Sequence, residues 1–352
     1  MDHPPASGKA SVWAAGSIVV ASMIGTGVYT SLGFQVAEIP SGFALLVLWV
    51  VGGVISLCGA LCYAELAAAL PRSGGEYHLL TNTFHPLAGF LSGWISLSVG
   101  FAAPVALSAM AFGAYLAPLL GMSSPLPLAL GVVVVVTAIH LLRLEVGSAF
   151  LNVFTVIKVV MILVFIGAAL LMPEPEPVVW APRRTDTALL FSGPFAVALI
   201  YVMYAYSGWN ASTYIVDEVR EPQRNVPRSL VGGTVLVTLL YALVHVAFLR
   251  SAPMDAYAGK IEVGLIAGQA LFGPRGGATM AVFICLGLVS MISAMTWSGS
   301  RVGLRMAEDY PRLHWLGRTT RHGIPWVTIL VQSSAAVLLL MTSTFESVLV
   351  YI

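Results

Sequence analysis

The chain has 352 residues, of which 58% are hydrophobic and only 9% are charged, and its mean hydropathy is +0.89. Soluble domains carry about 25% charged residues, so this composition indicates a protein that crosses a membrane several times. The net charge of +1 and the lack of a basic stripe argue against a nucleic-acid partner. The three cysteines lie in apolar segments, which predicts neither a disulfide framework nor a metal site.

Nine apolar segments follow one another along the chain, most of them near or above the ~20 residues that a spanning helix needs. They cover residues 12–36, 42–64, 86–117, 127–142, 148–172, 189–216, 229–249, 278–298 and 325–342. A tenth apolar stretch has only begun, at Val348, when the sequence stops. We therefore expect a partial chain that ends near the start of its tenth span.

The segments between the spans predict a tail, a connector and a short helix. Residues 1–11 are expected to form an N-terminal tail, and residues 173–188 an outer connector that starts with a stiff proline-rich run. The loop over 71–77 is predicted to turn and lead into a short helix. The segment 260–272 is predicted to be an amphipathic helix over the outer vestibule.

The basic residues of the loops predict the orientation. With the N-terminus inside, eleven Lys and Arg residues fall on the inner side and five on the outer side, and Lys158 lies within a span. Inner loops of membrane proteins carry the excess of Lys and Arg. The sequence therefore predicts a multi-pass protein of the cell membrane with a cytoplasmic N-terminus.

Glycines interrupt the first apolar segment at Ile24-Gly25-Thr26-Gly27-Val28. A broken backbone inside a membrane is tolerated where its freed N–H and C=O groups line a cavity and bind something. Two facing helix ends offer donors on one side and acceptors on the other, which suits the carboxylate and ammonium of a zwitterion. The alternative is a close helix contact mediated by small residues.

The sixth apolar segment carries a second interruption, at residues 204–210. Gly208 weakens a helix there, and the side chains of Ser207 and Asn210 compete for backbone hydrogen bonds. Five spans separate the two breaks, so the sixth span is antiparallel to the first. This is the pattern of an inverted repeat with substrate bound at the membrane midplane. We assign 12–172 to the first repeat and 189–352 to an incomplete second one.

Three linked motifs resemble signatures of the amino acid–polyamine–organocation transporter superfamily. They are residues 23–29 (MIGTGVY), 63–66 (YAEL) followed by 71–77 (PRSGGEY), and 206–210 (YSGWN) followed by 217–222 (DEVREP) and 225–228 (NVPR). The resemblance extends from about residue 12 to 352. It implies an all-α membrane protein with the five-plus-five inverted repeat of the leucine-transporter type, which usually has twelve spans and here ends near the start of the tenth.

The resemblance also implies a substrate site. It places the substrate carboxylate on the N–H groups and hydroxyl at residues 25–27, and the substrate ammonium on carbonyls near Met23, Tyr204 and Ser207. Tyr204 is interpreted as an aromatic lid over the bound side chain, with a packing tyrosine as the alternative. The predicted substrate-binding residues are Met23, Ile24, Gly25, Thr26, Gly27, Tyr204, Ala205 and Ser207.

Lys158 lies near the middle of the fifth span. A central lysine costs about +2.5 to +3.5 kcal/mol on insertion scales, so it indicates a function. The resemblance implies that its ammonium occupies the place where sodium-coupled relatives bind a cation. We predict that Lys158 couples transport to protons. The alternative is a permanently charged lysine that braces the first, fifth and eighth spans, with Ser290 or Ser293.

The function predicted from the breaks and the resemblance is secondary active transport of amino acids by alternating access, coupled to protons or by exchange. Neutral substrates are favoured because no acidic residue lies in the middle of the first, third, sixth or eighth span. The alternatives are a permease for cationic amino acids or polyamines with the same fold, a channel, and an amino-acid sensor that does not transport.

An enzyme has no support in the sequence. It contains no zinc-protease motif, phosphate loop or G-x-S-x-G elbow, so we expect no catalytic residue and no cofactor. His140 and His245 lack metal-ligand spacing and are interpreted as hydrogen-bonded structural groups. The expected partners are the lipid bilayer, an amino acid and protons, and the oligomeric state is left open.

Overall fold

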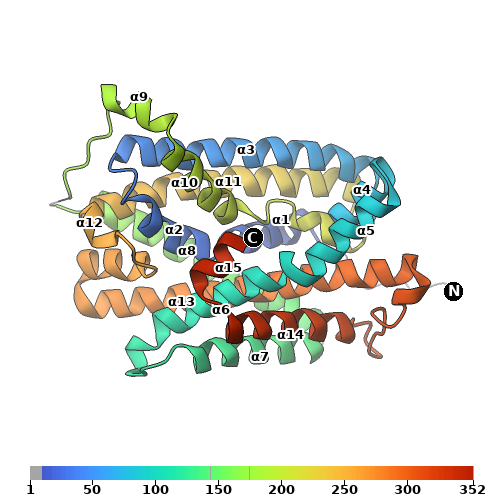
Figure 1. Cartoon of the computed structure of the whole chain (residues 1–352). Helices are drawn as coiled ribbons and strands as arrows, with labels where there is room; N and C mark the ends of the chain where they lie inside the picture. Colours follow the sequence, from blue (N-terminus) through green and yellow to red (C-terminus); the bar gives the residue numbers. More distant parts are fainter. Residues whose placement is uncertain (1–9, 143, 174, 352) are drawn as a thin grey trace.

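The computed structural model describes residues 10–142, 144–173 and 175–351 (Figure 1). Over these residues the chain is helical, without a β-strand, and a single backbone bridge pairs Ala10 with Val219. The α-helices are α1 (Val12–Met23), α2 (Thr26–Gln35), α3 (Gly42–Ala69), α4 (Glu76–Thr83), α5 (Pro86–Ile95), α6 (Ala102–Leu116), α7 (Leu126–Leu142), α8 (Leu144–Leu170), α9 (Arg184–Leu190), α10 (Gly193–Tyr206), α11 (Pro222–Ser251), α12 (Met254–Tyr257), α13 (Val263–Asp309), α14 (Trp326–Thr342) and α15 (Phe345–Tyr351).

The nine predicted apolar segments all become helical. Among the described residues, six stretches are long and apolar enough to cross a membrane, and a seventh is the pair α9 and α10, bent by 64°. Two shorter apolar helices, α7 and α14, account for the remaining segments. The prediction of an all-α membrane protein is therefore confirmed.

The long helices run along one direction of the bundle (Figure 1). α4 lies at one end and α12 at the other, and these are called the α4 end and the α12 end below. α3 packs along α11, α13 packs along α6, and α14 covers α6 and α7. α1 and α2 are the two halves of the first span and lie inside the bundle. There α1 contacts α8 and α11, and α2 contacts α10.

Short connections follow the local chemistry of the sequence. Gly74 and Gly75, with φ of 129° and 56°, form the turn predicted before α4. The predicted connector 173–188 is irregular only up to residue 183, because α9 already begins at Arg184; residue 174 lies outside the described residues. The third span contains a π-helical turn over Ser96–Gly100, between α5 and α6.

α13 is longer than the predicted eighth span, because it starts at Val263 and continues to Asp309. Gly273, with φ 71° and ψ −175°, separates the predicted amphipathic helix from the spanning part. The sequence prediction stopped at residue 298 because Arg301 and Arg305 lower the hydropathy beyond it. These arginines form ion pairs with carboxylates of the 3₁₀ turn Ala211–Glu218, so the helix continues.

Candidate substrate site between two interrupted helices

The first predicted helix break is present. α1 ends at Met23, and Ile24 leaves the helical region with φ −76° and ψ 88°. Gly25 begins α2 with φ −129° and ψ −144°, and no side chain caps that helix start. The first N–H groups of α2 therefore lack the side-chain partner that usually satisfies them, and the last carbonyls of α1 lie on the other side of the break.

The second predicted break is present as well. α10 ends at Tyr206, and Ser207 turns out of the helix with φ −57° and ψ 144°. Gly208 has a φ of 98°, a left-handed conformation that favours glycine. A Cβ on Gly208 would lie 2.9 Å from the backbone carbon of Ser22 in α1. The second break therefore packs directly against the end of the first half-helix.

Four of the predicted site residues meet where α2 begins and α10 ends. The hydroxyls of Thr26 and Tyr204 form a hydrogen bond of 2.7 Å. A Cβ on Gly27 would lie only 2.5 Å from the Cα of Ala205. On the other side of the break, a Cβ on Gly25 would overlap the sulfur of Met291, at 1.7 Å. Glycine is thus required at position 27 for α2 to contact α10, whereas a side chain at position 25 would displace the flexible Met291 side chain of α13.

Tyr241 of α11 joins the carbonyls freed by both breaks. Its hydroxyl lies 2.6 Å from the carbonyl oxygen of Met23 and 2.9 Å from that of Ala205. A tyrosine hydroxyl has one proton to donate, so it cannot fully satisfy both acceptors. The sequence did not point to Tyr241, because a tyrosine inside an apolar span is usually a packing residue.

Replacing Tyr241 by phenylalanine is expected to leave both carbonyls without this donor. An unsatisfied buried acceptor costs about 1–3 kcal/mol, so we expect a lower melting temperature and weaker binding of a ligand at the two breaks. Thermal unfolding with and without ligand measures both effects. Tyr201→Phe is the matched control, because this tyrosine of α10 packs its ring against Phe34. Equal behaviour of the two variants would contradict the bridging role.

Lys158 of α8 is fully buried and donates to the broken end of α1. Its Nζ lies 2.6 Å from the carbonyl oxygen of Ile24 and 3.2 Å from that of Ala21. The carbonyl end of a helix carries a partial negative charge, which favours an ammonium group there. The lysine stem packs against α13 at Gly287, where an added Cβ would lie 3.4 Å from Cγ.

The serines proposed as alternative partners of Lys158 do not bind it. Ser293 pairs with His140, at 2.7 Å between Oγ and Nε2, and the hydroxyl of Ser290 has no partner among the described residues. His140 and the second lone histidine, His245, are both hydrogen-bonded, as predicted; the Nδ1 of His245 lies 2.8 Å from the carbonyl of Tyr241. Any bracing by Lys158 therefore acts on α1 through its carbonyls.

A cavity of about 180 Å³ lies beside the two breaks, towards the α4 end. Among the predicted site residues it exposes only Ser207, and the other seven are buried behind it. The volume is below the 300–1,000 Å³ of pockets for drug-sized ligands and suits a small solute. The cavity is lined by Ser22, Glu76, Ser96, Gly100, Phe101, Pro104, Ser207, Gly208, Asn210, Ala211, Tyr214 and Met295.

Glu76, at the start of α4, is the one carboxylate among the residues that line this cavity. It accepts hydrogen bonds from the amide of Asn210 and the hydroxyl of Tyr214. Burial raises the pKa of Glu76, although these hydrogen bonds oppose the shift. The sequence placed Glu76 in a motif without a role, because the distance along the chain to Asn210 hides their contact.

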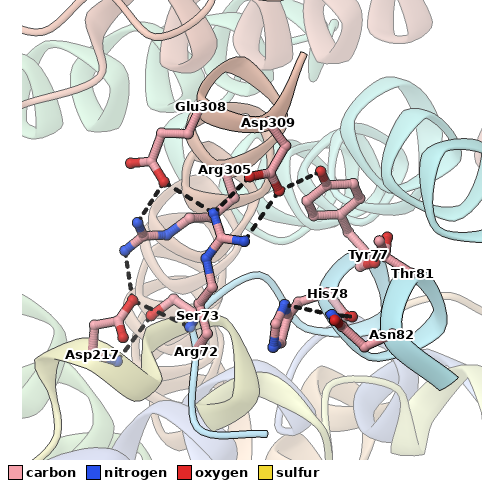
Figure 2. A network of polar contacts seen from close by, with 10 residues as sticks. All are labelled: Arg72, Ser73, Tyr77, His78, Thr81, Asn82, Asp217, Arg305, Glu308 and Asp309. Carbon is pink, nitrogen blue, oxygen red and sulfur yellow. Dashed lines mark hydrogen bonds and ion pairs between the residues drawn. The ribbon is translucent and has the colours of Figure 1, made fainter. Parts of the chain in front are cut away.

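An ion-pair network lies at the α4 end of the bundle (Figure 2). Arg72 bonds to Asp309 at 2.9 Å and to Glu308 at 3.3 Å. Arg305 bonds to Asp217 at 2.5 Å and to Glu308 at 2.7 Å. The network ties the loop before α4, the end of the second broken helix and the end of α13 together.

Two neutral groups and one more arginine extend the network. The hydroxyl of Tyr77 donates to Asp309 at 2.7 Å, and the backbone N–H of Asp217 donates to the hydroxyl of Ser73 at 2.9 Å. Arg301, which is nearly buried, pairs with Glu218 at 2.8 Å. The hydrogen bond from Arg72 to Asp309 raises the pKa of the Arg72 guanidinium, so this cation stays charged at any physiological pH.

Two interrupted helices meet inside a bundle of apolar helices, beside a small polar cavity, and the apolar helices define a multi-pass membrane protein. A family model described as amino acid permease matches residues 11–351. The chain belongs to this amino acid permease family.

The curated relatives include transporters of several kinds. Over 237 residues the chain is 31% identical to the b(0,+)-type amino acid transporter 1 of Mus musculus, and this aligned region covers 66% of the chain and 49% of that protein. It is 26% identical over 339 residues to the serine/threonine exchanger SteT of Bacillus subtilis (strain 168), covering 93% and 75%. It is 27% identical over 348 residues to the human Asc-type amino acid transporter 1, covering 94% and 65%. The chain spans about half the length of its b(0,+)-type relatives.

Proposed function

We propose that this protein is a secondary active transporter that moves an amino acid across the cell membrane by alternating access around the two interrupted helices. The observation that carries the proposal is the meeting of the breaks: Gly208 packs against Ser22, and the hydroxyl of Tyr241 reaches carbonyls of both. Freed backbone groups in a membrane interior are tolerated where they bind a ligand. The relatives described above, two amino acid transporters and a serine/threonine exchanger, support the same substrate class.

The proposed pose places the substrate carboxylate on the N–H groups at the start of α2, at Gly25, Thr26 and Gly27. The substrate ammonium binds the carbonyls of Met23 and Ala205. The single hydroxyl proton of Tyr241 cannot fully satisfy both of these acceptors, so one of them is open to the ammonium. Ile24 and Ser207 complete the set at the two breaks. The positive end of α2 and the negative end of α1 favour this polarity. Tyr204, hydrogen-bonded to Thr26, is the proposed lid.

Lys158 is the proposed coupling group, for protons or for exchange. In the charged state its ammonium holds the last carbonyls of α1. Loss of its proton removes the charge that these carbonyls bind, so α1 is released from α8. The same proposal assigns residues 12–172 to one inverted repeat and residues 189–352 to the other. It places the α4 end, which is rich in arginine, in the cytoplasm together with the N-terminus.

Neutral amino acids are the proposed substrates. Glu76 is the one acidic residue that lines the described cavity, and both its oxygens already accept hydrogen bonds. The same carboxylate favours the second candidate, a permease for cationic amino acids or polyamines, because it can pair with a cationic side chain. Competition of labelled leucine uptake by alanine, arginine and putrescine in proteoliposomes separates the two. Strong competition by arginine that Glu76→Gln removes would replace the first candidate by the second.

Thermal stabilisation of the purified protein across the twenty amino acids tests the substrate class, since a ligand of the native state raises the melting temperature. Counterflow in proteoliposomes then tests transport. We expect stabilisation by a few neutral amino acids and counterflow of the same ones. Stabilisation without counterflow would indicate a sensor, and conduction without counterflow a channel.

The ion-pair network at the α4 end is proposed to close that side in the present state. Replacing Arg305 by glutamine removes its pairs with Asp217 and Glu308. Exposed pairs contribute about 0.2–1 kcal/mol each, so the loss of both pairs is expected to make the modification of a cysteine introduced at Ala211 in the cavity about two- to thirtyfold faster. The measurement uses a water-soluble thiol reagent in a background without the native cysteines. Arg312→Gln is the control, and an unchanged rate in the Arg305 variant would contradict the gate.

A further inference from the structure

A second cavity, separate from the proposed substrate site, opens on the outside of the bundle between α1, α8 and α11. Its volume is about 470 Å³, within the range of pockets that bind organic ligands. Its walls include Val156, Val160 and Leu236, which are each between 43% and 59% exposed. In a protein that crosses a membrane, these exposed apolar side chains face lipid. This cavity is called the α1–α8–α11 groove below.

Glycines of two different kinds shape the groove. A Cβ on Gly233 would lie 2.8 Å from a methyl group of Val19, so this glycine allows α11 to pack against α1. In contrast, a Cβ on Gly16 or on Gly232 would meet nothing within 4 Å. Gly16 and Gly232 are therefore not required for packing, and their lack of a side chain leaves the groove open.

The mouth of the groove lies towards the α4 end and carries Trp13 and Arg228. Trp13 is 83% exposed. Tryptophan and arginine are typical of the boundary between the hydrocarbon core and the lipid headgroups. Trp13 lies in the first turn of α1 and Arg228 in the second turn of α11. The two helices start at the same end, because Ala10, just before α1, bridges Val219, just before α11.

The charge at the mouth is positive. Arg228 is exposed, none of the residues that line the groove is acidic, and Arg228 takes part in no ion pair with the side chains that the structure describes. Arg224 lies one helical turn earlier on α11 and is also exposed. A guanidinium presents a planar set of donors that matches the oxygens of a phosphate.

We propose that the α1–α8–α11 groove binds one anionic phospholipid of the bilayer, with an acyl chain between the three helices and the phosphate on Arg228. The apolar walls pack against the chain, but the surrounding lipid is equally apolar, so the headgroup contact decides which lipid is selected. The unpaired positive charge at the mouth selects a headgroup with net negative charge over a zwitterionic one. The anionic leaflet of a cell membrane supplies such lipids at the cytoplasmic surface.

Native mass spectrometry of the full chain, purified with equal amounts of phosphatidylglycerol and phosphatidylcholine, tests the proposal without reference to transport. We expect the wild type to retain one phosphatidylglycerol with about tenfold preference, because both lipids offer a phosphate to Arg228 but only phosphatidylcholine carries a cationic choline that the positive charge at the mouth repels. Gly232→Leu should lose the lipid because its side chain fills the groove. Gly131→Leu, at another glycine of a spanning helix with free space around its Cβ, should retain it.

The headgroup contact is tested by Arg228→Gln, which should remove the preference for phosphatidylglycerol but leave some binding of either lipid. Arg312→Gln, at an exposed arginine outside the groove, is the control. Gly16→Leu fills the groove from α1 and is the second variant should Gly232→Leu fail to give a monodisperse protein. Equal retention of both lipids by the wild type, or retained phosphatidylglycerol in a folded Gly232→Leu or Gly16→Leu variant, would overturn the proposal. So would a neutral sterol that displaces the phospholipid.

Discussion

Replacing Lys158 by alanine is expected to abolish or flatten the pH dependence of amino acid uptake in proteoliposomes. Lys158 is the titratable group that donates to Ile24 and Ala21 at the broken end of α1. Alanine cannot bind or release a proton, and hydrogen bonds from a charged donor contribute about 1.5–3 kcal/mol each. We therefore expect maximal uptake to fall by at least about tenfold, with the largest difference from wild type at the pH where the wild type is most active.

The control for this prediction is Lys260→Ala, which removes an exposed lysine before α13. It should keep the wild-type pH profile. Circular dichroism of both variants checks that the helices persist. An unchanged pH profile in Lys158→Ala would exclude the coupling role. If uptake in that variant were also slower than in the wild type, bracing of α1 would be the only remaining role of Lys158.

Replacing Gly27 by valine is expected to block substrate binding. Even a Cβ at this position would lie 2.5 Å from the Cα of Ala205, so valine must push α2 away from α10. Overpacking of this kind costs about 1–3 kcal/mol or more, which corresponds to a loss of about ten- to a hundredfold in affinity. The substituted side chain also covers the N–H groups proposed to bind the carboxylate. Ligand-induced thermal stabilisation measures the change.

The matched control is Gly167→Val on α8, where an added Cβ meets nothing within 4 Å. Its ligand response should equal that of the wild type. The melting temperature without ligand separates lost folding from lost binding, because a folded Gly27→Val protein still unfolds cooperatively. Wild-type affinity in the folded Gly27→Val variant would show that the carboxylate site has been placed wrongly.

Much of the site was predictable because it depends on glycine chemistry within single segments. Gly25 and Gly208 mark the two breaks, since a residue without a Cβ weakens a helix and adopts backbone conformations that other residues avoid. Lys158 was predictable as an important residue for a similar reason, because a charge in an apolar span is rare. Its contact with the carbonyls of Ile24 and Ala21 was not predictable from the residues alone, and it came from packing of α8 on α1.

Other parts of the site gave no local signal. In the sequence Tyr241 looks like a packing residue, yet its hydroxyl reaches carbonyls of both breaks. Glu76 looks like an ordinary acidic residue at a helix start, yet it lines the cavity. The ends of α13 were mispredicted for the same reason. Arg301 and Arg305 indicate a loop when they are considered alone, and only their carboxylate partners on another segment allow the helix to continue.

By itself the sequence determined where the nine apolar segments lie, the places where two of them break, and the lone charge within a span, because hydropathy and glycine content act over a few neighbouring residues. Only the tertiary structure decided which carbonyls Lys158 and Tyr241 bind, that the cavity exposes Ser207 while it buries Gly25 and Thr26, and that a groove opens between α1, α8 and α11. These features depend on which faces of distant helices meet. That choice is made by the packing of the whole bundle, where each side chain contributes a small part of the total free energy.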